Sequence, residues 1–241
     1  RSNLLFSTNL KVSLLDNFDD LIYPPVNTYP AQVRSDIKKY LNNLGENISI
    51  GRAQFEYFKT IKTNNHLLLT AGIFEEMFSG YGFEYLKFNP KSRINWGFEA
   101  SKVYKRGYKF DFDLLDYTNT TYFFNVFYKF RKGIAFDAKL SFGEYLAGDK
   151  GMTIELSRSF RNGISMGIFA TKTDVSADQF GEGSFDKGIF FNIPFNLPFV
   201  SNERKISNFT WRPLTKDPAS KLIKRNNLYS LVNKYSVIAV D

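Results

Sequence analysis

Residues 134–142 read IAFDAKLSF, a stretch in which bulky apolar residues alternate with small or polar ones. Successive side chains of a β-strand point to opposite faces, so this stretch would have one apolar and one polar face. The same alternation occurs at residues 4–14, 94–101 and 164–171. The pattern predicts strands, and its repetition along the chain predicts an all-β protein.

About 12 segments carry this pattern, and most are close to the ~9–11 residues that a tilted membrane strand needs. They lie near residues 3–15, 47–62, 66–75, 80–89, 93–104, 119–131, 133–143, 151–160, 163–173, 187–196, 205–213 and 227–237. Pro194 and Pro198 weaken the end of the tenth segment and the residues just after it, because proline cannot donate a hydrogen bond to a strand ladder.

The connections alternate between short and long. Short turns are expected at 62–65, 89–93, 131–133 and 161–163, and longer loops at 16–46, 105–118, 144–150, 174–186 and 214–226, with 75–80 a shorter member of the long set. A Greek-key sandwich has no reason to keep this alternation. We therefore predict one domain over residues 1–241: an antiparallel up-and-down transmembrane β-barrel with short periplasmic turns, long extracellular loops and a tail at 238–241.

One short helix is expected in the longest loop, at residues 35–44. Ser35 and Asp36 are suited to cap its start, and Ile37, Tyr40 and Leu44 follow helical spacing. This helix would fold over the mouth of the barrel or into its lumen.

The composition fits a surface that faces lipid. The chain has 26 Phe and 14 Tyr, yet only 43% of its residues are hydrophobic and 23% are charged. No apolar run reaches about 18 residues, which excludes a membrane-spanning helix. The chain contains no cysteine, which excludes disulfides, thiolate catalysis and thiolate metal sites. We expect its first residues to be a processed or trimmed end, because no signal peptide opens the sequence.

Alternation alone does not say which face meets lipid. A soluble lipid-binding barrel also alternates, with its apolar residues inward, and that alternative stays open. The membrane interpretation is favoured because charged residues recur in mid-strand and because aromatic residues gather near strand ends, as at a membrane interface. These aromatic residues are Tyr57, Tyr81, Tyr85, Trp96, Tyr122 and Tyr128.

The net charge of +8 suggests acidic partners such as a polyanionic glycan, lipopolysaccharide phosphate or nucleic acid. The basic residues are scattered rather than clustered in an arm or on one helix face. We therefore expect most of them to lie at rims and turns, and we do not expect nucleic acid to be a partner.

The charged residues in mid-strand are the candidate lumen-lining or glycan-binding residues. They are Arg52, Glu56, Glu84, Glu99, Asp137, Lys139 and Glu155. Two interpretations stay open: a polar track for a sugar chain, or a packed set of charges that plugs and stabilises a narrow barrel.

Catalysis is not expected. Glu75 and Glu76 suggest a carboxylate pair for glycoside hydrolysis, but neighbours on a strand point to opposite faces, so both can aim at one glycosidic bond only if the chain turns there. His66 is the only histidine, so neither a histidine-based triad nor a multi-histidine metal site can form. We expect no catalytic residue, no metal and no cofactor.

Four stretches carry a family resemblance. They are VRSDI at 33–37 followed by Tyr40, AGIFEEMFSG at 71–80, GSFDKG at 183–188 and WRPL at 211–214. In order and spacing they resemble the YjbH family of Gram-negative outer-membrane proteins linked to exopolysaccharide and capsule export. The motif positions, whose roles the resemblance leaves unknown, include Arg34, Asp36, Glu75, Glu76, Asp186, Trp211 and Arg212.

The resemblance implies the C-terminal barrel region of a longer protein of the bacterial outer membrane, and an N-terminal region beyond this chain. The implied partners are membrane lipid, lipopolysaccharide, polysaccharide and export-machinery proteins. The expected function is passive: the barrel guides or holds exopolysaccharide or capsule glycan during secretion or at the surface. The alternatives are a plugged scaffold for export partners and an outer-membrane enzyme acting on glycan or lipid.

Outer-membrane barrels usually end in a strand whose last residue is aromatic. This sequence instead ends Ala239-Val240-Asp241. The position of the closing strand is therefore left open.

Overall fold

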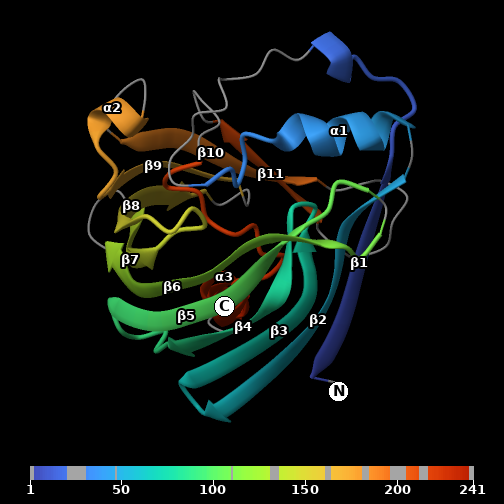
Figure 1. Ribbon diagram of the computed structural model, residues 1–241. Coiled ribbons are helices and arrows are strands. Elements are labelled where there is room, and N and C mark those ends of the chain that lie inside the picture. The colour runs from blue at the N-terminus through green and yellow to red at the C-terminus, as the bar shows by residue number, and fades with distance from the viewer. Residues whose placement is uncertain are drawn as a thin grey trace.

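Over the residues that the structure describes, the fold is one antiparallel sheet of eleven strands in which each strand pairs with the next along the chain (Figure 1). The computed structural model describes residues 3–20, 31–46, 48–109, 111–130, 136–160, 164–180, 185–195, 205–211 and 217–238. The strands are β1 (Leu4–Val12), β2 (Ile48–Lys62), β3 (Asn65–Glu75), β4 (Phe78–Lys87), β5 (Ile94–Arg106), β6 (Leu114–Phe130), β7 (Phe136–Glu144), β8 (Lys150–Ser159), β9 (Ser165–Thr173), β10 (Asp186–Phe195) and β11 (Lys205–Trp211).

The predicted all-β, antiparallel up-and-down arrangement is confirmed. The predicted loop at 105–118 is too long, because β5 continues to Arg106 and β6 already begins at Leu114. The turns expected at 131–133 and 161–163 lie outside the described residues. Over the part of the chain that the structure describes, the sheet is open between β1 and β11, so its closure into a barrel stays a prediction.

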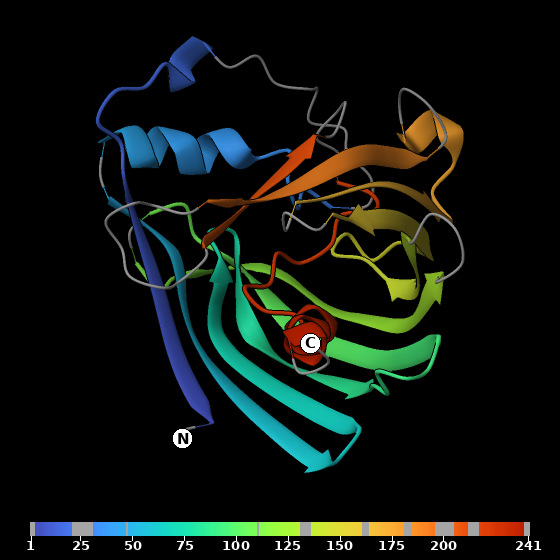
Figure 2. The ribbon, with the colours of Figure 1, turned by 180° about the vertical axis from the view of Figure 1, so that it is seen from behind.

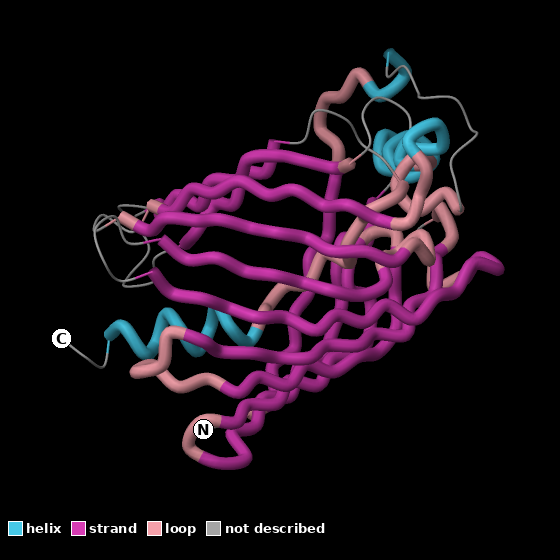
Figure 3. Tube along the Cα trace, turned by 90° about the vertical axis from the view of Figure 1, so that its left-hand side faces the viewer, coloured by secondary structure: helices cyan, strands magenta, loops and turns pink. Residues whose placement is uncertain are grey.

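The predicted helix at 35–44 is confirmed as α1 (Ile37–Glu46). The other short elements are the 3-10 helix η1 (Phe18–Asp20), α2 (Ala177–Phe180) and α3 (Leu228–Ile238). Figure 3 shows α1 across one end of the strands and α3 lying along the sheet toward the other. We call these the loop end and the turn end, since the tight β2–β3 turn lies at the second. None of the helices in the described residues is long and apolar enough to span a membrane.

The strand predicted at 227–237 is wrong, because this segment forms α3. Asn227 caps the helix: its side-chain oxygen accepts the backbone N–H of Ser230 at 3.2 Å. Leu228, Leu231 and Val232 recur at the helical spacing of three and four residues, and Leu228 and Val232 pack against the sheet. Packing against an apolar patch of the sheet thus favoured the helical alternative.

The two faces of the sheet differ sharply. Figure 2 shows the sheet curving around α3, so that one face is concave. This inner face carries buried polar side chains: Ser7, Gln54, Glu56, Glu84, Asn95, Ser101, Thr121, Asn125, Ser141, Thr153 and Thr171. The outer face carries exposed apolar side chains, among them Phe6, Phe55, Leu69, Phe83, Phe124, Phe142, Ile154 and Ile168. Glu56 is 1% exposed, whereas Ile168 is 54% exposed.

Among the described residues, the two larger apolar clusters interrupt the polar inner face. The first lies at the loop end next to α1 and contains Val33, Tyr40, Phe74, Met77, Phe78, Val103, Leu146 and Ala147. The second lies between the sheet and α3 and contains Leu68, Leu86, Phe88, Phe127 and Leu228. Both clusters hold non-strand segments against the inner face, so the polar side chains between them are covered by protein.

Candidate functional site

The charged residues of the inner face are bound by the chain's own residues 217–238, which we call the C-terminal segment. Lys224 forms an ion pair with Glu99. Lys221 lies 3.7 Å from Glu155, and the side-chain amide of Asn226 donates to Glu56 at 2.7 Å. The face on which a glycan track was predicted is therefore lined by carboxylates that already have partners.

Glu84 accepts hydrogen bonds from residues at the start of α3. Its carboxylate accepts the side-chain amide of Asn227 at 2.9 Å and the backbone N–H of Leu228 at 3.3 Å. The first N–H groups of a helix have no partner within the helix, and the N-terminal end of its dipole favours a negative charge. Glu84 supplies an acceptor to the first of these N–H groups and sets the position of α3 on the sheet.

The remaining predicted lumen residues also lie on the inner face. Lys139 pairs with Glu155 at 3.1 Å, and the Arg52 guanidinium donates to the carbonyl of Phe74 at 2.9 Å. Asp137 is half-buried near the turn end. The structure thus brings the seven residues to one face, whereas their role in glycan binding stays a prediction.

Aromatic contacts hold the far part of the C-terminal segment. The ring of Tyr229 stacks on Phe127 with centroids 3.8 Å apart and meets Phe88 edge-on at 5.8 Å. The ammonium of Lys129 donates to the side-chain carbonyl of Asn233 at 2.5 Å. Polar contacts therefore fix residues 221–228, and stacking fixes the helix after them.

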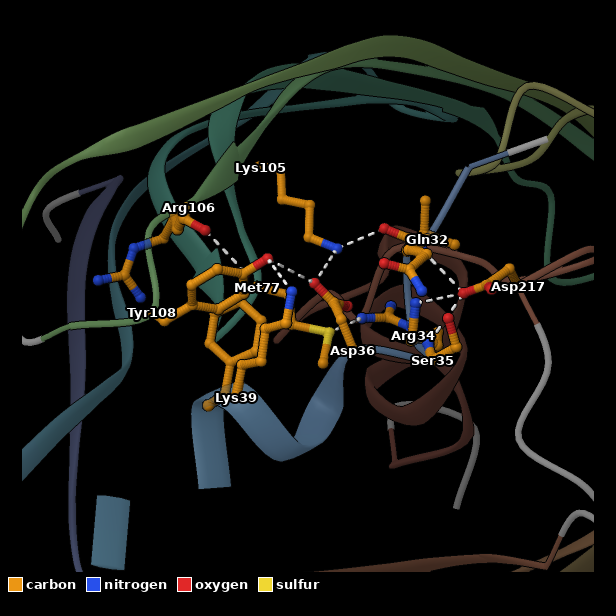
Figure 4. Close-up of polar contacts among 12 residues, drawn as sticks. Gln32, Arg34, Ser35, Asp36, Lys39, Met77, Lys105, Arg106, Tyr108 and Asp217 are labelled. Carbon is orange, nitrogen blue, oxygen red and sulfur yellow. Dashed lines mark hydrogen bonds and ion pairs between the residues drawn. The ribbon is translucent and has the colours of Figure 1, made fainter. Parts of the chain in front are cut away.

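A second group of polar contacts lies at the loop end, shown in Figure 4. One carboxylate oxygen of Asp217 accepts three consecutive backbone N–H groups, those of Val33, Arg34 and Ser35, at 2.8, 2.6 and 2.9 Å. Three donors on one carboxylate make a strong, charge-assisted cap. Asp217 thereby joins the start of the C-terminal segment to the residues that precede α1.

Two buried ion pairs extend this group. Arg34 contacts Glu75 at 2.8 Å and also donates to the carbonyl of Lys221 at 3.0 Å. Lys105 contacts Asp36 at 2.6 Å and also donates to the carbonyl of Gln32. We call Arg34, Asp36, Glu75, Lys105 and Asp217 the end cluster; it ties α1, the sheet and the C-terminal segment together.

Glu76 belongs to a different set of contacts from Glu75. Its carboxylate accepts Lys11 at 2.6 Å and the Ser49 hydroxyl at 2.7 Å, while its backbone carbonyl accepts Arg106 at 2.9 Å. The two adjacent glutamates therefore diverge to separate partners. This geometry does not present a pair of carboxylates to one substrate bond.

Two tyrosines close the end cluster on the side of α1. The Tyr40 hydroxyl donates to the carbonyl of Arg106 at 2.7 Å, and the Tyr108 hydroxyl donates to Asp36 at 3.3 Å. Burial, and then the negative charge of Asp36, raise the pKa of both Tyr40 and Tyr108. Both hydroxyls therefore remain protonated donors at neutral pH.

The family-motif positions separate into two groups. Arg34, Asp36 and Glu75 meet in the end cluster, with Glu76 beside them. Asp186 is instead a buried residue at the start of β10, and Trp211 ends β11. Arg212 lies outside the described residues.

Sequence reasoning does not find the residues that pair with the inner-face charges or those that complete the end cluster. These are Lys105, Asp217, Lys221, Lys224, Asn226 and Asn227. The described part of the loop predicted at 214–226, residues 217–226, has no helix or strand and lies on the inner face. Sequence does not reveal this placement, because polar composition is the same in a solvated loop and in a segment that meets a polar interior. The helix α3 could have been predicted, because a capping residue, Asn227, precedes apolar residues at helical spacing.

The cap of α3 gives a first prediction. Asn227→Ala removes the helix cap and one bond to Glu84, so we expect it to lower the free energy of unfolding by about 1–2 kcal/mol. Asn227→Ser keeps a capping oxygen and should lose less. Urea unfolding of both variants measures the difference, and an alanine variant as stable as the parent would contradict the assignment of the cap.

Comparison with known proteins gives two matches and one absence. Residues 1–234 match the family model YjbH, described as exopolysaccharide biosynthesis protein YbjH. A protein of Escherichia coli (strain K12) named uncharacterized lipoprotein YjbH is 30% identical over 242 residues, which is 98% of this chain and 34% of the relative. The chain thus spans about a third of that relative's length. No solved structure gives a significant match. Because the family match extends over nearly the whole chain, the chain belongs to the YjbH family of exopolysaccharide biosynthesis proteins.

Proposed function

We propose that the chain forms a β-barrel of the bacterial outer membrane, filled by its own C-terminal segment, that acts as a scaffold in exopolysaccharide or capsule secretion. One observation carries this proposal: the sheet is inverted, with polar side chains buried on its inner face and apolar side chains exposed on its outer face. A soluble barrel has the opposite arrangement.

The extent of the apolar outer face supports a lipid environment. Soluble monomers rarely expose a contiguous apolar patch larger than a few hundred Å². Here exposed apolar residues occur on strands from β1 to β10, including Phe6, Phe83, Ile154 and Phe191. Lipid is the solvent in which such a surface is stable.

Aromatic pairs near the turn end support the same environment. Tyr85 lies 5.6 Å from Trp96, and Tyr128 lies 4.4 Å from Phe130, measured between ring centroids. Tyrosine and tryptophan concentrate at membrane–water interfaces, where the ring is apolar and its polar edge reaches water.

The family supports a role in exopolysaccharide production, and the name of the E. coli relative, a lipoprotein, supports a location in the cell envelope. That relative is about three times as long as this chain. We therefore propose further regions of the protein, together with export proteins, polysaccharide, lipopolysaccharide and membrane lipid, as partners.

The filled inner face supports a scaffold rather than a pore. Glu56, Glu84, Glu99 and Glu155 all contact the C-terminal segment. A sugar chain could use the same face only after this segment leaves it. Passive guidance of glycan is thus the second candidate function, favoured by the run of charged residues along the inner face.

We also propose that the chain is not an enzyme. Glu75 and Glu76 are each held by cations or hydroxyls of the fold. His66 is the single histidine and its ring contacts only the Thr60 hydroxyl among the polar groups described, at 3.1 Å. Neither set supplies a nucleophile beside a free base.

Folding in detergent tests the proposal. The chain, refolded from urea, should gain β-sheet circular dichroism and run faster unheated than heated on a gel only when micelles are present. In planar bilayers the same protein should be closed. Folding to a monodisperse protein in plain buffer would sink the membrane assignment, and a constitutive open conductance would favour the second candidate.

A further inference from the structure

A cavity of about 700 Å³ lies between α3 and the inner face of the first strands, at the turn end. Its apolar wall is made by Leu5, Phe58 and Phe88 from the sheet side and by Leu228, Leu231 and Val232 from α3. Its volume lies within the ~300–1,000 Å³ of ordinary small-molecule sites, and a mostly apolar wall is typical of such sites. The cavity lies beside α3 and the end cluster beside α1, and these two helices lie toward opposite ends of the strands (Figure 3).

The ionisable groups at this cavity carry one sign of charge. Of the described residues that line it, Lys59, His66 and Arg225 are ionisable, and none is acidic. Lys59 and Arg225 are exposed, and neither makes an ion pair or hydrogen bond with another described residue. An apolar cavity with the cation Arg225 at its mouth fits an amphiphile with an anionic head.

The rim around the cavity is also basic. Lys62, Lys87, Lys91, Arg93 and Arg158 are exposed at the turn end. Among the residues described at this end (59–66, 87–95, 128–130, 136–137 and 157–160), Asp137 is the single carboxylate. Clustered basic side chains beside an aromatic band attract a surface of anionic phospholipid.

We propose that this cavity binds one anionic phospholipid, with an acyl chain against α3 and its phosphate at Arg225. Each CH₂ group buried from water favours binding, and the guanidinium supplies paired donors to phosphate oxygens. The inference rests on the proposed membrane function only for the source of the lipid. A bound lipid would fill the space beside α3 and hold the C-terminal segment in place.

The test uses the full chain folded in maltoside micelles, with phosphatidylglycerol and phosphatidylcholine as probes. Native mass spectrometry should find one retained phosphatidylglycerol, and the protein should unfold at a higher temperature with this lipid than with phosphatidylcholine. Arg225→Gln should weaken phosphatidylglycerol binding about tenfold, as expected for the loss of a charged hydrogen bond. Leu231→Trp, which fills the cavity, should also abolish retention.

Arg158→Gln is the matched control, because it removes an exposed cation of the same rim whose guanidinium stacks on Phe160 at 4.9 Å and does not line the cavity. It should bind phosphatidylglycerol as the parent does. Equal retention of the two lipids would overturn the inference, as would retention unchanged by both cavity variants. Protection by glycerol phosphate equal to that by the lipid would overturn it as well, since the acyl chain would then play no part.

Gel mobility recorded on the same samples separates this inference from the proposed function. A protein that folds in micelles but releases phosphatidylglycerol overturns the inference alone. A protein that folds only in plain buffer overturns the membrane function, and specific one-to-one retention of phosphatidylglycerol there would leave the cavity assignment standing.

Discussion

Reversing the charge of Lys224 should release the C-terminal segment from the inner face. Lys224→Glu would place a third carboxylate beside Glu99 and Glu84, which are directly opposite each other on β4 and β5. Breaking a largely buried ion pair by loss of one partner costs about 3–5 kcal/mol. We expect a loss of at least about 3 kcal/mol in the free energy of unfolding, measured as a fall of about 1 M or more in the urea midpoint.

The same variant should change conductance. If the segment fills the lumen through these contacts, Lys224→Glu should give channel openings in planar bilayers where the parent gives none. The double variant Lys224→Glu with Glu99→Lys restores opposite charges and should recover part of the stability. Lys109→Glu, an exposed change in the connection between β5 and β6, is the control. A closed and fully stable Lys224→Glu protein would show that the segment is held by other contacts.

Removing the carboxylate of Asp217 should destabilise the loop end by a similar amount. Asp217→Ala leaves the backbone N–H groups of Val33, Arg34 and Ser35 without their acceptor, and Val33 and Ser35 are buried. Each buried donor without a partner costs about 1–3 kcal/mol. Allowing for relaxation, we expect a total loss of about 3–5 kcal/mol, seen in urea unfolding and in faster hydrogen exchange at these three amides.

Asp217→Asn is the informative comparison. The amide oxygen still accepts the N–H groups but lacks the negative charge, so its loss should be about half that of the alanine variant. Equal losses would mean that charge, rather than the number of acceptors, holds residues 33–35. Exchange rates at the α3 amides report whether the effect spreads along the C-terminal segment.

These two variants act on the same segment at separate sites. Asp217 fixes its start at the loop end, and Lys224, Asn226 and Asn227 fix it along the sheet. Because the contacts lie in distinct regions, their effects should add approximately. A chain whose own residues satisfy the charges of the inner face has little need of a ligand there, which is why a scaffold is the better supported function.

Much of the fold can be predicted from alternation alone. Eleven of the predicted strands exist, and their pairing follows chain order as the short turns predict. The helix α1 is also predictable, since Ser35 and Asp36 precede residues at helical spacing. The error at residues 227–237 has a local cause: the apolar content of this stretch suits a strand as well as a helix, and only the Asn227 cap separates the two.

The candidate sites are less accessible to sequence reasoning. The charged positions of the inner face can be identified because period two assigns each residue to a face. Their partners lie far away along the chain: Glu99 and Lys224 are 125 residues apart, and Val33 and Asp217 are 184 apart. No local pattern connects such residues.

The sequence by itself determined the strands, the two unlike faces and the set of charges on one of them, because these depend on side-chain direction over short stretches. The tertiary structure alone decided that residues 217–238 occupy the concave face, that Arg34 and Asp36 meet Glu75 and Lys105, and that a cationic apolar cavity remains beside α3. A polar segment gains similar hydrogen bonds from water or from a polar protein interior. Only the shape of the folded sheet selects between them.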